Sequence, residues 1–155
     1  MRDIKTIKLG EICQRVRNCN PAIDIGESFF TYVDIASVDK DLKAVIGASK
    51  ILGTEAPSRA RQIIKSDDVL VSTVRPNLNA VAKISEDYHQ AVASTGFCVL
   101  RPKESQLSST YLYYWVQSKD FIDEMVKRAT GANYPAVSDA IIKSAKIPLP
   151  DLDTQ

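Results

Sequence analysis

The sequence predicts a single α+β domain, in which a twisted and mostly antiparallel sheet is followed by helices that lie mainly in the C-terminal third. Short runs of β-branched and aromatic residues, separated by turn residues, recur from Phe29 to Leu100, as in successive strands. Between Ser109 and Ala145 the apolar residues recur at helical spacing instead. The chain has 155 residues, 45% hydrophobic and 25% charged, which suits one globular domain with its own core.

The first third of the chain carries weaker signals of regular structure. Residues 28–38 are rich in aromatic and β-branched types and predict a strand. Asp34 falls inside this strand, where we expect a structural hydrogen bond rather than catalysis, because a buried carboxylate needs a partner. The other predictions before residue 53 are a weak strand at 6–9, a helical turn at 10–14, a polar surface loop at 15–21, and short strands at 44–46 and 50–52.

The stretch 56–82 is the most informative part of the chain. Residues 69–74 are β-branched and nearly uncharged, which predicts a strand covered on both faces. Pro76 donates no backbone N–H and disfavours helix at the residue before it, so the strand should end in a loop at 75–79. We expect a returning strand at 80–84.

The predicted loop presents Arg75, Asn77 and Asn79 within five positions. Arginine pairs bidentately with guanine and asparagine with adenine in the major groove, so these are the side chains of direct base readout. Loops held by a rigid sheet are also where binding residues collect. The alternative is ordinary turn chemistry, since asparagine beside proline is common in turns.

Charge is concentrated in the same stretch. The whole chain has a formal net charge of +1, but between residues 57 and 83 five basic residues outnumber two acidic ones. We interpret this excess as a modest patch that favours contact with DNA phosphates, although a solvated surface would look similar. The predicted phosphate contacts are Arg59, Arg61 and Lys65.

The last third of the chain predicts two or three helices. Ser108 or Ser109 is suited to cap the first helix, and residues 118–120 are suited to divide the helical run. Gly131 is available for a left-handed cap at the end of the run. Asn133 and Tyr134 follow on a loop, where they either contact DNA or buttress the domain. Beyond this loop, we expect a short helix capped at Ser138–Asp139 and a final extended segment at 146–150.

Several other kinds of site are not predicted. Three cysteines without a CxxC pair and a single histidine, His89, give no zinc set and no complete disulfide framework, so we expect no metal or cofactor. Charges at residues 1–5 and the lack of a membrane-length apolar run predict a cytoplasmic protein without a membrane segment. Ser94 and Thr95 resemble nucleophiles only superficially, because nothing in the sequence marks His89 as their base.

Segments in order along nearly the whole chain resemble the target recognition domain of type I restriction-modification specificity subunits. Each fragment alone is a weak signal, but the ordered set is specific. The segments are YVDIASVD at 32–39, PSRARQ at 57–62, DVLVSTVRP at 68–76, STGFCVLRP at 94–102, TGANYPAVS at 130–138 and IPLP at 147–150.

This resemblance implies sequence-specific binding of double-stranded DNA without chemistry of the chain's own. In the family, each recognition domain reads one half of a bipartite site. Separate modification (methyltransferase) subunits bind S-adenosylmethionine and methylate adenine, and a restriction (motor-nuclease) subunit cleaves unmethylated DNA. The set of residues expected to contact DNA is Arg59, Arg61, Lys65, Arg75, Asn77, Asn79, Asn133 and Tyr134.

The resemblance also leaves alternatives open. A full specificity subunit resembles two such domains joined by long helices, whereas this sequence carries one domain and no heptad stretch, as an excised domain or a half-subunit would. A protein-interaction module, such as an assembly piece or a decoy of a restriction system, would fit the near-zero net charge. A small hydrolase using Ser94 or Thr95 is the third interpretation.

Overall fold

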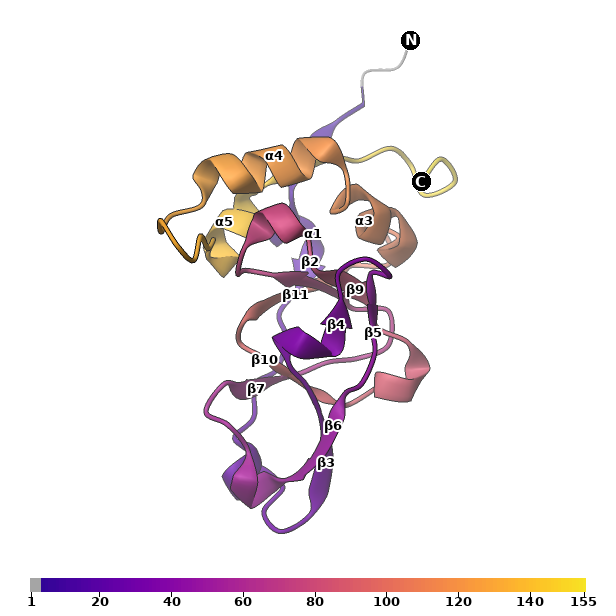
Figure 1. Ribbon diagram of the computed structural model, residues 1–155. Coiled ribbons are helices and arrows are strands. Elements are labelled where there is room, and N and C mark those ends of the chain that lie inside the picture. The colour runs from indigo at the N-terminus through magenta and orange to yellow at the C-terminus, as the bar shows by residue number, and fades with distance from the viewer. Residues whose placement is uncertain (1–3) are drawn as a thin grey trace.

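Two four-stranded sheets follow one another along the molecule, and the helices of the C-terminal third gather at the end next to one of them (Figure 1). The computed structural model describes residues 4–155. Met1, Arg2 and Asp3, which belong to the charged start of the chain, lie outside the described residues. The arrangement confirms the predicted α+β domain with mostly antiparallel pairing.

The sheet next to the helices has the strand order β2-β11-β8-β9, and all its pairs are antiparallel. Its strands are β2 (Cys13–Gln14), β11 (Phe97–Pro102), β8 (Val69–Ser72) and β9 (Val81–Lys83). Every residue of β8 is buried, as predicted for a strand covered on both faces. β8 ends at Ser72 rather than Val74. The Ser72 hydroxyl accepts a hydrogen bond from Val74 N–H and donates one to Val74 O, so these backbone groups do not pair with a neighbouring strand.

The other sheet has the order β6-β3-β10-β7. Its strands are β6 (Ser49–Leu52), β3 (Phe29–Val33), β10 (Val92–Ser94) and β7 (Ala60–Ile63). β3 and β10 run parallel, and the other two pairs are antiparallel. Two further pairs lie outside these sheets: β1 (Thr6–Lys8) with β12 (Lys146–Pro148), and β4 (Val38–Asp39) with β5 (Ala44–Val45). Strands β1, β2 and β12 therefore extend beyond the predicted range of Phe29 to Leu100.

The helices begin where the sequence predicts. Ser108, Ser118 and Ser138 each accept a hydrogen bond on the side-chain oxygen from a backbone N–H in the first turn, at 3.2–3.3 Å. The helices they cap are α3 (Ser109–Trp115), α4 (Lys119–Arg128) and α5 (Asp139–Ser144). Together with α1 (Leu9–Ile12) they cover the main hydrophobic core, which includes Leu112, Phe121 and Ile142.

The predicted strand at 28–38 is wrong in its second half. β3 stops at Val33, and residues Ile35–Ser37 form a short 3₁₀ helix, η1. The Asp34 carboxylate accepts a hydrogen bond from Ile35 N at 2.7 Å, and the Ser37 hydroxyl accepts one from Asp34 N at 3.1 Å. This reciprocal capping ends the strand. Asp34 therefore makes the expected structural hydrogen bond, but it is exposed rather than buried.

Three other segments differ from the predictions. α2 (Pro21–Asp24) begins inside the expected polar loop, with proline in the first turn where its missing N–H costs nothing. Gly131 has φ +103° but is not the helix cap, because α4 ends at Arg128 and Ala129 is already extended. The loop at 75–79 contains a 3₁₀ helix, η3 (Pro76–Leu78). The remaining 3₁₀ helices are η2 (Gly53–Glu55) and η4 (Glu86–Tyr88).

Candidate nucleic-acid interface

Backbone hydrogen bonds join four separate loops at one end of β8. Thr73 N–H donates to Gly96 O and Val137 N–H donates to Thr73 O, both at 2.9 Å. Arg75 N–H donates to Pro135 O at 2.7 Å, and Thr95 N–H donates to Arg59 O at 2.8 Å. We call the surface formed by residues 57–59, 73–79, 95–96 and 130–137 the loop face. Because its loops are bonded to one another, it presents side chains from distant parts of the sequence in a fixed arrangement.

Arg75 is held in an unusual backbone conformation at the centre of the loop face. Its φ of 47° and ψ of 64° lie in the left-handed region, which costs a non-glycine residue about 1–2 kcal/mol. The backbone bond to Pro135 and a stacking contact hold it there: its guanidinium carbon lies 5.0 Å from the centroid of the Tyr134 ring. The side chain remains exposed. Strain of this kind, kept by surrounding contacts, is typical of functional sites.

The two predicted asparagines of the same loop have different environments. Asn77 is exposed in the middle of η3. Asn79 is 7% exposed, and its side-chain amide donates to Val116 O at 3.0 Å. A base contact by Asn79 would be costly, because reaching DNA would break a buried hydrogen bond and leave the Val116 carbonyl without this donor. Asn79 is a structural residue that fixes η3 against the end of α3.

Lys43 strengthens this anchor from the other side. Its ammonium donates to Asn79 O at 2.6 Å and contacts Asn79 Oδ1 at 3.3 Å. The Tyr113 hydroxyl donates to Lys43 O at 2.7 Å, so α3 holds the β4–β5 turn as well. Burial lowers the pKa of Lys43, the charged Asp41 partly opposing this. The loop at 75–79 and the β4–β5 turn thus share one anchor on α3.

The three predicted phosphate contacts do not lie together. Arg59 is exposed on the loop face, next to Thr95. Arg61 is half-buried on β7, whose edge is joined to the 17–19 segment by a bond from Cys19 N–H to Arg61 O at 2.7 Å. Lys65 lies beyond the other end of β7, in the turn that leads into β8. The four residues of β8 lie between it and Arg75, and a strand of that length spans roughly 13 Å.

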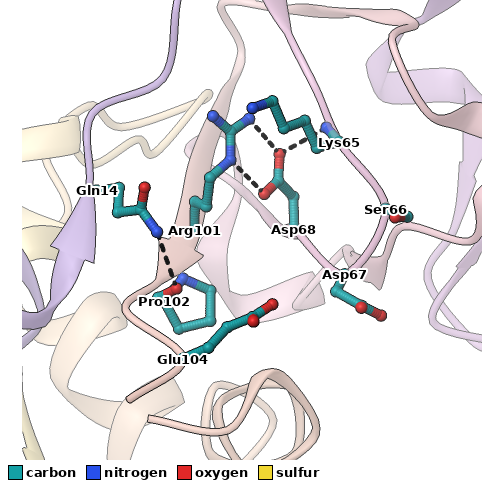
Figure 2. Close-up of a pocket in the computed structure, with 8 residues that line it drawn as sticks. All are labelled: Gln14, Lys65, Ser66, Asp67, Asp68, Arg101, Pro102 and Glu104. Atoms are coloured by element: carbon teal, nitrogen blue, oxygen red, sulfur yellow. Dashed lines mark hydrogen bonds and ion pairs between the residues drawn. The ribbon is translucent and has the colours of Figure 1, made fainter. Parts of the chain in front are cut away.

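The turn that carries Lys65 borders a separate polar pocket of about 260 Å³ (Figure 2). Inside it, Arg101 makes two hydrogen bonds to the Asp68 carboxylate, both at 2.8 Å, and Lys65 N–H donates to the same carboxylate. Asp68 is 1% exposed, so this bidentate ion pair is buried. The ion pair that lines the pocket connects β11 to the 64–68 turn, so its role is structural.

The loop at 130–137 places the last two predicted residues on the loop face. Thr130 and Ala136 pair through two backbone hydrogen bonds, which close the loop and project its tip. Asn133 and Tyr134 are both exposed at that tip, and the Tyr134 ring is turned toward Arg75. The structure therefore brings together Arg59, Arg75, Asn77, Asn133 and Tyr134.

Two residues of this region are not in the expected set of DNA contacts, although phosphate contact is a minor alternative for the Ser94–Thr95 hydroxyls. Thr95 is exposed and lies between Arg59 and Thr73, so its hydroxyl borders the loop face. Lys40 is exposed at the start of the β4–β5 turn and borders the same groove as Arg75. Thr95 lies in the segment STGFCVLRP at 94–102, which belongs to the family pattern and could have identified it as a candidate. Lys40 carries no such signal, because only the pairing of β4 with β5 brings it here.

The hydrolase interpretation does not match the positions of its groups. Ser94 is fully buried, and its hydroxyl accepts a hydrogen bond from Gly96 N–H at 3.0 Å, which shapes the turn into β11. The His89 ring accepts a hydrogen bond from Ser66 N–H at 3.0 Å, beyond the opposite end of β10. The buried Ser94 hydroxyl and the His89 ring therefore take part in hydrogen bonds of different turns.

The thiols are poor candidates for chemistry as well. Burial raises the pKa of Cys13 to about 12 and also raises the pKa of Cys98. Among residues 4–155, no three His, Cys, Asp or Glu side chains are grouped as metal ligands would be. No helix in that part of the chain has the length and apolar character needed to cross a membrane.

Comparisons with known proteins agree with the geometry. A sequence model of the type I restriction modification DNA specificity domain matches residues 1–155. A curated relative is the type I restriction enzyme HindI specificity subunit of Haemophilus influenzae Rd, which is 24% identical to this chain. The alignment is 168 residues long and covers 100% of this chain and 33% of the relative. The chain therefore spans about a third of the length of this relative.

Two solved structures share the fold. The HsdS subunit of Thermoanaerobacter tengcongensis superposes with a TM-score of 0.88 at 33% identity, covering 96% of this chain and 38% of that one. A chain from a structure of complex assembly and conformational transition in a type I R-M system superposes with a TM-score of 0.91 at 31% identity, covering 99% and 40%. The fold, the ordered motifs and the match along the whole sequence agree: this chain belongs to the family of type I restriction modification DNA specificity domains.

Proposed function

We propose that the chain reads one half of a bipartite DNA site through the loop face, as one recognition domain of a type I specificity subunit. The observation that carries this proposal is the exposed Arg75, strained at its backbone and stacked on Tyr134, on a loop that α3 anchors through Asn79. The fold keeps this guanidinium in one position despite the backbone strain. Bidentate pairing with guanine requires such a fixed position.

The exposed residues of the loop face have different roles in this proposal. Arg75 and Asn77 read base edges, and Asn133 at the tip of the neighbouring loop reads a further edge. Arg59 and the Thr95 hydroxyl contact phosphates and set the register of the domain on the duplex. Lys65 and Arg61 lie away from these readers, so any contact they make is with the flanking backbone.

The partners follow from the relatives rather than from this chain. Specificity subunits belong to restriction-modification systems, so the proposed partners are modification subunits that methylate adenine and a motor-nuclease subunit that cleaves DNA. The chain itself acts without catalysis in this account. It supplies the sequence preference, and the partner subunits supply the chemistry.

Selection from a random duplex library with the full chain tests the proposal. We expect enrichment of one short motif, and we expect Arg75→Ala to weaken binding by about 1–3 kcal/mol while relaxing one position of it. Arg75→Lys is the matched control, because it keeps the charge but not the bidentate geometry, and it should relax the same position. Arg59→Ala should weaken binding to all sequences alike and flatten the salt dependence.

A protein-interaction module is the second candidate, and the net charge of +1 favours it. That role predicts salt-insensitive binding to a modification subunit with no enriched DNA motif. Enrichment of a motif that Arg75→Lys then relaxes would exclude it as the main function of the loop face.

A further inference from the structure

An open apolar groove of about 540 Å³ is lined partly by the loop face and partly by the neighbouring η1–β4 segment. Its apolar walls include Ile35 and Val38 from the η1–β4 segment, and Val74 and Leu78 from the loop face. The Tyr134 ring borders the groove. A surface built only to hold phosphates and polar base edges gains nothing from such walls, since apolar surface facing water or a phosphate is unfavourable.

The wall at Ile35 is fixed by close packing. Gly96 lies behind it, and a Cβ atom at that glycine would come within 2.9 Å of Ile35 Cδ1. Gly96 is also bonded through its carbonyl to Thr73 N–H and to the Thr73 hydroxyl, both at 2.9 Å. The Ile35 side of the groove is therefore packed against the turn between β10 and β11.

Two cations identify the kind of ligand the groove suits. Lys40 and Arg75 both line it, so two positive charges accompany its apolar walls. The groove is also continuous with the proposed base-reading loop, since Arg75 directly precedes η3 and Leu78 is its last residue, and both line the groove. A ligand that suits this combination has an apolar group on its edge and phosphates beside it. In the major groove of DNA, the apolar group on a base edge is the C5-methyl of thymine.

We propose that this groove receives the C5-methyl group of a thymine, so that the half-site read by this chain contains at least one thymine recognised by its methyl group. The inference rests on the proposed function and makes it specific. Leu78, 41% exposed, contacts the methyl from the η3 side, and Ile35 contacts it from the η1 side. Lys40 and Arg75 hold the backbone and the adjacent base pair.

Replacement of thymine by deoxyuridine tests the inference, because it removes only the methyl group. The motif enriched by the full chain is synthesised with each thymine replaced in turn, and affinity is measured by fluorescence anisotropy. We expect one replacement to weaken binding roughly fourfold, the value for removing one buried methyl group. In Leu78→Ser, the same replacement should weaken binding less than twofold. Val74→Thr keeps the shape of the wall and should reduce the effect in the same direction.

Leu152→Ser is the matched control, because Leu152 is 43% exposed and lies outside the groove. It should keep the fourfold effect. A defined motif without thymine, or one whose thymines all tolerate deoxyuridine, would overturn the inference while leaving DNA reading intact. A fourfold loss of affinity on deoxyuridine replacement that persists in Leu78→Ser would also overturn it. So would a Leu78→Ser variant that discriminates thymine as before but no longer binds a modification subunit. Failure to enrich any motif would remove the proposed function and this inference together.

Discussion

The guanidinium carbon of Arg75 lies 5.0 Å from the centroid of the Tyr134 ring, although the two residues belong to loops far apart in the sequence. The loops are joined by the hydrogen bond from Arg75 N–H to Pro135 O. The same bond that fixes the Arg75 backbone therefore also places Tyr134, the residue before Pro135, beside it. The pair places a planar, charged group at the mouth of an apolar groove. The proposed reading of DNA by Arg75 depends on this contact.

Removing the ring should therefore weaken DNA binding through Arg75. We expect Tyr134→Ala to reduce affinity for the enriched motif by about 0.5–1 kcal/mol, the strength of an exposed cation–π contact. Tyr134→Phe keeps the ring face and should stay close to the original affinity. Anisotropy titrations of both variants check this. Equal losses in the two variants would instead indicate that the hydroxyl, not the ring, is what matters.

Arg75→Gly should separate stability from function. Glycine relieves the left-handed strain of about 1–2 kcal/mol, while the variant loses the stacking contact and gains unfolded-chain entropy. These effects oppose one another, so we expect the free energy of unfolding to change by less than about 1 kcal/mol. Discrimination at one motif position should disappear. Urea denaturation and library selection measure the two properties, and a large destabilisation would show that the strain interpretation is wrong.

Asn77 and Asn79 should respond in opposite ways to alanine. Asn79→Ala leaves the Val116 carbonyl without its donor and forces alanine into a left-handed conformation, so we expect a loss of at least about 2 kcal/mol in unfolding free energy. Asn77→Ala should stay within about 0.5 kcal/mol, since the side chain is exposed. Denaturation curves for the pair settle this. A DNA-binding defect in Asn77→Ala at unchanged stability would assign it to reading.

The buried ion pair at the other end of β8 should matter for stability alone. Asp68→Asn leaves the Arg101 charge buried without its counter-charge, and we expect a cost of about 3–5 kcal/mol. Asp67→Asn is the control, because the Asp67 carboxylate is exposed and pairs with Lys83 at 3.4 Å, so the change should alter stability by under about 1 kcal/mol. Thermal or urea unfolding compares them. Similar values would mean that the bidentate geometry contributes little.

Local signals predicted much of this fold. Serine caps at 108, 118 and 138 and the buried run at 69–72 act through neighbours a few residues away, and the structure follows them. The half of the predicted strand after Val33 was wrong because the capping by Asp34 and Ser37 competes with strand pairing. Proline in the first turn started a helix that the polar composition of 15–21 concealed.

The site was harder to predict because its contacts are long-range. Nothing local to Asn79 indicates that Val116 and Lys43 satisfy its side chain, so it could not be distinguished from the exposed Asn77 two residues earlier. Lys65 shares a short sequence stretch with Arg59, but β7 carries it to the opposite end of the sheet. The groove is formed by η1, the η3 loop and Tyr134, three segments that only the tertiary fold brings together.

The most direct test of the central claim is a domain graft. Residues 1–155 replace one recognition domain of a well-behaved type I specificity subunit, modification subunits are supplied, and methylated adenines are mapped across a plasmid library. We expect a bipartite motif with one familiar half and one new half, and we expect Arg75→Ala to relax only the new half. A soluble, assembled complex that methylates no defined site, or a new half unchanged by Arg75→Ala, would contradict the account.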